Sequence, residues 1–245
     1  PSFLNDFDFF LRTKANINNN SAVKHTKNLS KILKICYQNN WIEKDLVIFY
    51  KGRFNEVNVN FLTDEELSSI REKEFSGKGL ELVRDLFVFS CFTGLAYIDI
   101  FNLTKDQLSK GIDGNLWIIT NRQKTGSASN IPLLPVAEEI IKKYENHPVS
   151  SNSGKLLPVY TNQKVNEYLK TIAENCGINK KLTFHCARHT FATTVTLGNN
   201  VSMESVSKML GHRSIKTTQH YAKILDKKVS EDMGNLKVVL QRKNE

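Results

Sequence analysis

The residues whose types could do chemistry gather near the carboxyl end of the chain. His185 and Arg188 stand three apart, so on a helix both side chains reach the same face and can act on one group. His212 follows Arg188 by 24 residues, and Tyr221 follows His212 by 9. An arginine fork binds phosphate oxygens, and a tyrosine that gives its proton to an imidazole becomes a nucleophile. Together these types favour attack on a phosphodiester.

The series resembles the tyrosine recombinases, the phage-integrase family of DNA strand-transfer enzymes. The resemblance rests on His-x-x-Arg, Leu-Gly-His and a Ser-Ile-x-Thr-Thr helix that carries the tyrosine, all in order. Farther upstream, the sequence FTGL at 92–95 and the segment from QKT at 123–125 to IPL at 131–133 also match. The resemblance therefore covers residues 60–225, and the helical segment before them is similar, with less distinctive motifs, to the family's core-binding domain.

The resemblance implies a task for each of five residues. Arg188 would hold the extra negative charge of the pentacoordinate phosphate. Tyr221 would attack it, with His185 as the base that takes the tyrosine proton and His212 as a donor to a phosphate oxygen. Lys124, on a hairpin, would protonate the departing 5′ oxygen. The implied intermediate is a covalent 3′-phosphotyrosyl bond, which conserves the bond energy, so we expect no cofactor and no metal ligand.

One position departs from the family pattern. The family usually has an arginine directly after Thr-Gly-Leu, and here that residue is Ala96. Losing one of two phosphate-binding arginines would remove roughly 3 to 4 kcal/mol of transition-state stabilisation. Arg122 stands two residues before Lys124, and alternate residues of a strand share a face, so we predict that Arg122 replaces the missing cation. Some integrases of Bacteroidetes mobile elements resemble this arrangement, with a small residue after Thr-Gly-Leu, and we expect this chain to match that subgroup best.

Simpler explanations exist for the same residues. Taken alone, Tyr221 is an ordinary half-buried aromatic. His185 and His189 are four apart, which also suits a zinc pair on a helix, but the glutamate of an HExxH motif is absent and Arg188 would put a cation beside the metal. We therefore expect no metal, and we expect His189 to be a supporting or core residue.

Composition points to the same kind of partner. The 245 residues include 34 Lys+Arg and 25 Asp+Glu, a net charge of +9, which favours nucleic acid or an anionic membrane surface. No run approaches the roughly 20 apolar residues of a membrane-spanning helix. The four cysteines are scattered, which favours free thiols in a reducing cytosol. We expect a cytoplasmic, nucleoid-associated protein that binds DNA and no membrane.

The amino-terminal elements are two helices, over residues 3–12 and 21–39. At 100° per residue, one side of the second helix carries Leu29, Ile32, Leu33 and Cys36. The opposite side carries Lys24, Lys27, Lys31 and Lys34. Such a stripe alone is typical of a solvated face, but beside the phosphate chemistry we predict that it follows the DNA backbone.

The polar residues 51–62 suit a linker, and a capping box at Thr63 and Glu66 opens the next helix. We therefore predict a helical, core-type DNA-binding domain over 1–58, truncated on its N-terminal side because the chain begins with Pro1. A catalytic domain with a carboxyl-terminal tail follows over 59–245.

The predicted fold is mainly α with a small antiparallel sheet. A strongly apolar helix over 80–92 ends at Gly94, and two strands are expected at 116–120 and 130–134. Further helices are expected from Pro135 and over four later segments: 162–175, 185–197, 202–210 and 214–225.

The predicted function is site-specific recombination, for integration or excision of a phage or mobile element. The partners would be double-stranded attachment sites, further copies in a tetramer on two duplexes, and host or element accessory factors. The tail has apolar residues that could contact a neighbouring copy or its own domain: Ile224, Val229, Met233, Leu236, Val239 and Leu240. The alternatives are a non-catalytic DNA-binding protein with the same fold and a type IB topoisomerase.

Overall fold

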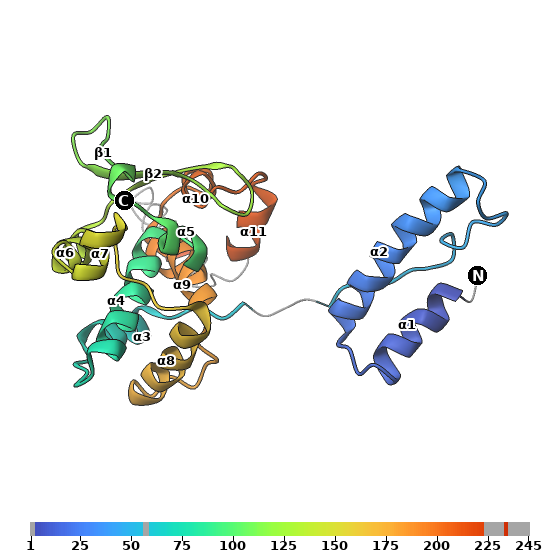
Figure 1. Cartoon of the computed structure of the whole chain (residues 1–245), viewed down its shortest axis with the longest axis horizontal. Coiled ribbons are helices and arrows are strands. Elements are labelled where there is room, and N and C mark those ends of the chain that lie inside the picture. The colour runs from blue at the N-terminus through green and yellow to red at the C-terminus, as the bar shows by residue number, and fades with distance from the viewer. Residues whose placement is uncertain (1–2, 56–58, 223–232, 235–245) are drawn as a thin grey trace, which may run out of the picture. The chain divides into compact units, whose positions relative to one another are not determined.

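The computed structural model describes residues 3–55, 59–222 and 233–234. The chain divides into two compact units, Pro1–Asn58 and Val59–Glu245 (Figure 1). In the part of the chain described, no helix is both long and apolar enough to cross a membrane.

The N-terminal unit consists of two helices, α1 (Phe3–Thr13) and α2 (Asn19–Gln38), that lie side by side (Figure 1). Its small core holds Leu4, Leu11, Ala22 and Val23. Polar bonds add to this core, because the Asp8 carboxylate accepts from the Arg12 guanidinium at 2.6 Å and from the Tyr50 hydroxyl at 3.1 Å. The unit thus relies on few apolar contacts.

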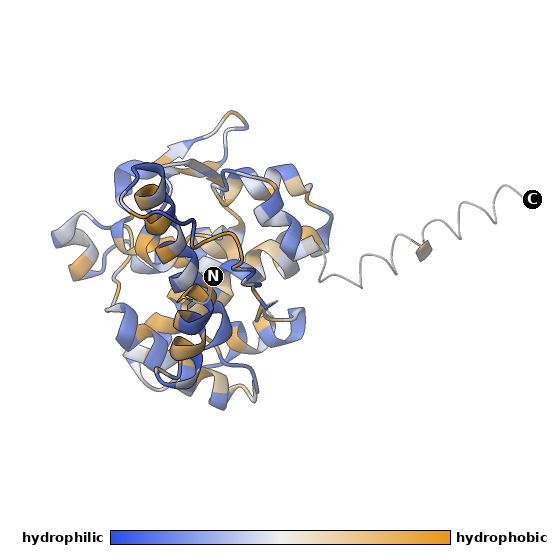
Figure 2. Cartoon of the chain, turned by 90° about the vertical axis from the view of Figure 1, so that its right-hand side faces the viewer, coloured by the Kyte–Doolittle hydropathy of each residue, from blue (hydrophilic) through white to orange (hydrophobic). Residues whose placement is uncertain are grey.

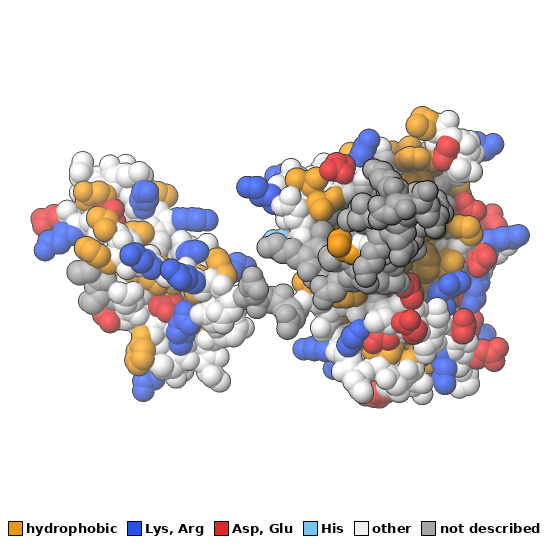
Figure 3. Space-filling model, turned by 180° about the vertical axis from the view of Figure 1, so that it is seen from behind, with side chains coloured by type: hydrophobic (Ala, Val, Ile, Leu, Met, Phe, Trp, Pro, Cys, Tyr) orange, Lys and Arg blue, Asp and Glu red, His pale blue; other side chains and the backbone are white. Residues whose placement is uncertain are grey.

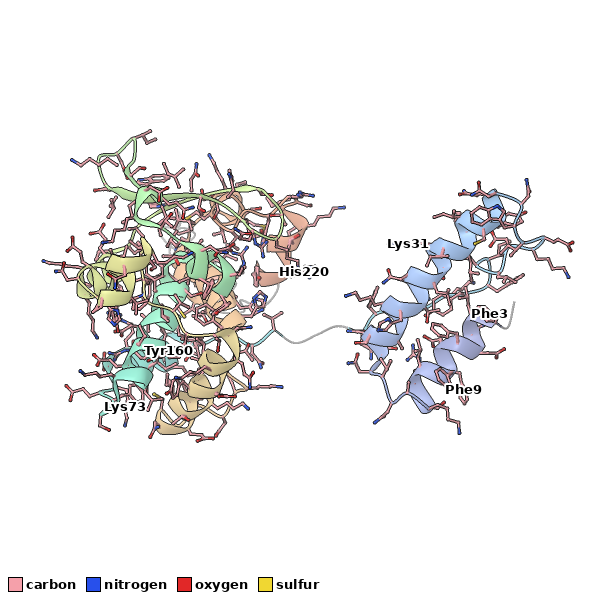
Figure 4. The ribbon with its side chains drawn as sticks, viewed as in Figure 1. Phe3, Phe9, Lys31, Lys73, Tyr160 and His220 are labelled. Atoms are coloured by element: carbon pink, nitrogen blue, oxygen red, sulfur yellow. The ribbon has the colours of Figure 1, made fainter. Side chains whose placement is uncertain are left out.

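The buried face of α2 differs from the predicted one. Ile32, expected on the inner side, is 59% exposed, and the buried residues of the helix are Ala22, Val23, Thr26 and Ser30. Small side chains let α1 approach α2 closely, and apolar periodicity alone does not reveal them. The four lysines of the predicted stripe are exposed, and Lys31 points away from α1 in Figure 4. Figure 3 shows cationic and hydrophobic side chains side by side on this unit.

The helices of the chain carry both hydrophobic and hydrophilic residues (Figure 2). The described α-helices of the larger unit are α3 (Asp64–Glu72), α4 (Lys78–Thr93), α5 (Tyr97–Asn102), α6 (Pro135–Tyr144), α7 (Pro148–Ser153), α8 (Asn162–Asn175), α9 (Phe184–Thr190), α10 (Met203–Met209) and α11 (Lys216–Ala222). The apolar α4 is central and contacts α3, α6, α8 and α9. The mainly helical fold with a small sheet is the predicted one.

Two predicted helix signals are present. Thr63 Oγ1 accepts from the Glu66 amide at 3.2 Å, and the Glu66 carboxylate accepts from the Thr63 amide at 2.8 Å, which is the capping box of α3. Gly94 ends α4 with a φ of 70°. A Cβ there would lie 2.5 Å from a Phe191 ring atom and 2.9 Å from Leu210, so this turn requires glycine.

The sheet has three antiparallel strands in the order β1 (Leu108–Lys110), β2 (Leu116–Asn121) and β3 (Ala128–Pro132). Ile118 of β2 pairs with Ile131 of β3, and both are buried. The last strand lies two residues earlier than predicted, and β1 was not predicted. The β2–β3 hairpin extends toward α10 and α11 (Figure 1).

The helix predicted over 185–197 is not uniform. The α-helix α9 continues as a π-helix over Phe191–Thr196 and a 3-10 turn over Leu197–Asn199. The Thr196 hydroxyl donates to the Phe191 carbonyl at 2.7 Å. A wider π turn changes which residues face inward, and it lets Phe191 join a second, smaller core with five others: Ala192, Leu197, Val206, Leu210 and Tyr221.

The predicted apolar tail falls mostly outside the described residues. Ile224, Val229, Leu236, Val239 and Leu240 are among those not described, whereas Met233 is described and is 52% exposed. Of the predicted helix over 214–225, the described part is α11, Lys216–Ala222.

Candidate active site

Arg188 is the most deeply enclosed cation of the predicted site. Its side chain comes from α9 and is 2% exposed. One terminal nitrogen donates to the Gly94 carbonyl at 2.6 Å, and the other donates to the Leu210 carbonyl. Burial and the nearby charge of Arg122 lower the pKa of Arg188 to about 10, so it stays protonated at neutral pH. A guanidinium has more N–H donors than these two bonds use, which leaves donors for an anion.

Tyr221 is 6% exposed and lies in the smaller core. Its hydroxyl is 3.0 Å from Nδ1 of His189. Burial raises the pKa of Tyr221, while the charges of Arg188 and Arg122 oppose that rise. The imidazole within hydrogen-bond distance of the hydroxyl is therefore His189, which the sequence suggested only as a supporting or core residue.

His185 lies one helical turn before His189 and touches its ring edge to face, with ring centroids 4.4 Å apart. The residue is exposed, but the enclosed part of its ring and the charges of Arg188, Arg122 and Lys124 lower its pKa. Burial, followed by the charges of His185 and Arg188, lowers the pKa of His189 to about 4. Both rings are therefore neutral near pH 7, and a neutral imidazole can accept a proton.

His212 follows α10 in the chain and lies in the turn that leads to α11. Its ring stacks on that of Tyr221, with centroids 6.4 Å apart and planes 13° apart. Nδ1 is 2.8 Å from the Thr218 hydroxyl, which fixes the ring orientation. Burial, together with the charges of Arg188 and Arg122, lowers its pKa to about 4.

Arg122 and Lys124 lie in the turn of the β2–β3 hairpin. The Arg122 amide donates to the Ser127 carbonyl at 2.9 Å, and the Gly126 amide donates to the Arg122 carbonyl at 2.8 Å. Gly211, with a φ of 59°, lies against this turn, because a Cβ there would be 3.5 Å from Cβ of Arg122. The hairpin thereby meets the segment that carries His212.

The electrostatic surroundings put Arg122 close to the other predicted residues. Its charge depresses the pKa of His185, His212 and Arg188. Its Nε is buried and has no hydrogen-bond partner among the described residues. A buried donor without a partner is costly, and a bound anion would satisfy it.

Ala96 lies just before α5 and lines a surface hollow together with His185 and Asn166. Three residues on, Asp99 is 6% exposed. Its carboxylate accepts from the Ala96 amide at 3.3 Å and from the Gln123 amide at 3.0 Å. Sequence reasoning missed Asp99, although an acid at that distance from the anomalous alanine was a visible signal.

The four lysines predicted to bind DNA belong to the N-terminal unit and not to this cluster. All four are exposed, and Lys27 Nζ lies 4.4 Å from the centroid of the Phe54 ring. Within the described ranges, no group of three or more His, Cys, Asp or Glu side chains could hold a metal ion.

The larger unit is thus a mainly helical domain with a small sheet, in which the rings of His189 and His212 and the charges of Arg188 and Arg122 lie near one tyrosine. Residues 60–228 match the family model described as the phage integrase family, and residues 1–52 match the phage integrase SAM-like domain. The first match covers more than half of the chain, so the chain belongs to the phage integrase family.

Two curated relatives of the chain are named as tyrosine recombinases. The tyrosine recombinase XerC of Rickettsia canadensis is 29% identical over 170 residues, covering 65% of this chain and 50% of the relative. The tyrosine recombinase XerD of Lacticaseibacillus casei is 30% identical over 172 residues, covering 65% and 57%. The chain therefore spans about half the length of the curated relatives that it matches.

Solved structures share the fold. The XerH site-specific recombinase in a post-cleavage complex with a palindromic difH substrate has a TM-score of 0.74 and 18% identity, over 94% of this chain and 71% of the other. A lambda integrase dimer bound to a COC′ core site has a TM-score of 0.69 and 18% identity, over 89% and 77%. At such identities the likeness concerns the fold.

Proposed function

We propose that this protein is a site-specific DNA recombinase that cleaves and rejoins duplex DNA through a 3′-phosphotyrosyl intermediate. The observation that carries the proposal is the grouping at Tyr221. The rings of His189 and His212 pair with the tyrosine ring, His185 packs on His189, and the charges of Arg188 and Arg122 act on the tyrosine. A protein that only binds DNA needs cations, but it needs neither a nucleophile nor groups that transfer protons.

The contacts support an order of steps. Tyr221 Oη forms a bond to the scissile phosphorus while the bond from phosphorus to the 5′ oxygen breaks. The tyrosine proton goes to His189, whose Nδ1 is 3.0 Å away, and His185 lies beside that ring as a second acceptor. Lys124 gives its proton to the departing 5′ oxygen. Religation is the reverse of these transfers, so it consumes no nucleotide.

Arg122 replaces the arginine that the family usually has at the position of Ala96. A free Nε and a charge that acts on His185, His212 and Arg188 support this role. Two guanidinium groups then meet the phosphate, one from α9 and one from the hairpin. Their charges stabilise the extra negative charge of the transition state.

Residues 1–58 serve as the core-type DNA-binding domain, with Lys24, Lys27, Lys31 and Lys34 on the phosphate backbone, and residues 59–245 as the catalytic domain. The active form is a homotetramer on two duplexes, assisted by host or element accessory factors and associated with the nucleoid. The alanine after Thr-Gly-Leu supports an origin in a Bacteroidetes mobile element.

The test is covalent trapping on a nicked suicide substrate made from the ends of the proposed element. The wild-type chain should form a protein–DNA adduct that denaturing electrophoresis separates from free protein. Tyr221→Phe should form none while it still binds the same DNA in a mobility-shift assay. A full adduct yield from Tyr221→Phe would contradict the assignment of the nucleophile.

A non-catalytic DNA-binding protein is the second candidate, since Ala96 replaces a family arginine and burial raises the pKa of Tyr221. In that case wild-type protein would bind DNA without any adduct. Relaxation of supercoiled plasmid without sequence dependence would instead favour a type IB topoisomerase.

A further inference from the structure

Both neighbours of Lys124 in the chain are fixed through their backbone. The Gln123 amide donates to the Asp99 carboxylate at 3.0 Å. The Thr125 carbonyl accepts from the Arg213 guanidinium, which belongs to the turn after α10. Lys124 itself is exposed. The direction of its side chain therefore depends on bonds that its neighbours make to two different elements.

The strand that follows Lys124 is attached to the last residue of α10. Ser129, 2% exposed, donates its hydroxyl hydrogen to the Met209 carbonyl at 2.5 Å. Gly211 lies directly against this strand, since a Cβ there would be in van der Waals contact with the Ala128 carbonyl oxygen at 3.4 Å, and its φ of 59° favours glycine. The segment from Met209 to Arg213 thus holds the hairpin on one side.

That segment also reaches the other reacting groups. The Leu210 carbonyl accepts from Arg188, and His212 stacks on Tyr221. One short turn therefore contacts the hairpin, the buried arginine and the tyrosine. A shift of the hairpin relative to this turn would move Lys124 away from the phosphate that the other groups hold.

We propose that Arg213 is a positioning residue, which holds the Lys124 hairpin against the His212 turn so that Lys124 can protonate the leaving 5′ oxygen. The inference rests on the proposed strand-transfer function and deepens it. During cleavage the bond from phosphorus to O5′ breaks and the Lys124 proton moves to that oxygen. During religation the 5′ hydroxyl attacks phosphorus, returns its proton to Lys124 and releases Tyr221.

Replacing the leaving 5′ oxygen of the DNA substrate by sulfur distinguishes a positioning role of Arg213 from a general structural role. A DNA strand with a bridging 5′-phosphorothiolate at the scissile bond releases a thiolate. Because a thiol is a far stronger acid than an alcohol, this leaving group needs no general acid. On ordinary DNA, Arg213→Ala should cleave on the order of 10- to 100-fold more slowly, the scale of a small misplacement of a catalytic group. On the sulfur substrate its rate should return to the wild-type rate.

Three further variants make the comparison specific. Lys124→Ala should show a larger defect and the same recovery on sulfur. Arg213→Lys keeps a cationic donor and should lose less activity on ordinary DNA than Arg213→Ala. Lys216→Ala removes an exposed cation three residues away and should cleave both substrates at the wild-type rate.

Several outcomes would overturn the inference. Equal slowing of Arg213→Ala on both substrates would mean a general structural role. A weaker DNA affinity with a lower salt dependence, and an unchanged rate at saturating DNA, would make Arg213 a phosphate contact. If the wild-type protein forms an adduct with neither substrate, the proposed function fails and the inference fails with it.

Discussion

Four lysines of α2 are exposed along a helix of the N-terminal unit, whereas Arg188 of the larger unit is 2% exposed and bonded to two backbone carbonyls. Exposed cations bind phosphates through screened, salt-dependent attraction and carry no fixed geometry. A buried guanidinium is already oriented before the substrate arrives, which strengthens its effect on a transition state. The same type of charge thus suits holding DNA in one unit and chemistry in the other.

The two units also differ in how much of their apolar surface is buried in a core. The N-terminal unit buries only a few apolar side chains and leaves Phe9 65% and Trp41 72% exposed. The larger unit buries ten of the sixteen residues of α4, with Phe87 and Phe89 fully buried. A well-packed core keeps side chains in fixed rotamers, and catalytic groups need that precision. Backbone contacts to DNA do not need it.

The largest expected effect concerns Arg122. Arg122→Ala should lower the cleavage rate of a suicide substrate by roughly 100- to 1000-fold, because one of two cations at the phosphate is lost. DNA affinity should change much less, which a mobility-shift titration would measure. The double variant Ala96→Arg with Arg122→Ala should recover part of the rate, since it restores an arginine at the family position. Near-normal cleavage by Arg122→Ala would mean that Arg122 lies outside the reaction.

The next effect is a difference in acid sensitivity between the units. Burial holds the pKa of His189 and His212 at about 4 in the folded larger unit, below the ordinary 6.5 of an unfolded histidine. Between these values the unfolded chain binds more protons, so the larger unit should lose stability as the pH falls from about 6.5 to about 4. The Arg12 hydrogen bond lowers the pKa of Asp8, so its contribution to the N-terminal unit is lost only below the ordinary 3.8.

Urea unfolding of the full chain can follow each unit separately. Trp41 reports on the N-terminal unit and Trp117 on the larger one, so Trp117→Phe and Trp41→Phe isolate the two fluorescence signals. The Trp117 transition should move to lower urea between pH 6.5 and 4.5 and the Trp41 transition should stay. His189→Gln should reduce the shift. A parallel shift of both transitions would contradict a histidine origin.

The smallest expected effect is the change in the salt dependence of DNA binding when the exposed lysines of α2 are replaced. Each lysine that contacts phosphate should contribute about 0.9 to the slope of log affinity against log salt, so Lys24→Ala alone changes that slope little. Replacing all four lysines should lower the slope by up to about 3.6. The cleavage rate at saturating DNA should remain unchanged, since the lysines belong to the other unit. A fall in that rate would contradict the hypothesis that one unit binds DNA and the other carries out the chemistry.

Local signals predicted most of the elements. Thr63 with Glu66 forms the expected capping box, Gly94 ends the expected helix, and the helix over Asn162–Asn175 has the predicted bounds. Each of these depends on residues close in the chain. The short β1 was missed because three residues carry too little pattern, and it forms only by pairing with β2.

The site was harder to predict where contacts join distant segments. Motif spacing singled out Tyr221 and His185, yet the imidazole that shares a hydrogen bond with the hydroxyl is His189, because α11 packs against the π-helix that continues α9. The acid three residues after Ala96 was visible in the sequence, but its partner was not, because Asp99 accepts from a backbone amide of the hairpin 24 residues away. The face of α2 was misjudged at Ile32, since its inner surface consists of small residues.

The two carbonyl bonds of Arg188 bear on how this protein can change in evolution. Gly94 and Leu210 belong to different parts of the fold, and removing the guanidinium would leave both buried carbonyls without their donor, at a cost of about 1 to 3 kcal/mol for each. A descendant without the proposed recombination activity would still be selected to retain this arginine for stability. Among diverged relatives, Arg188 should therefore outlast the activity, and loss of Tyr221 or Lys124 should be the earlier sign that catalysis has been abandoned.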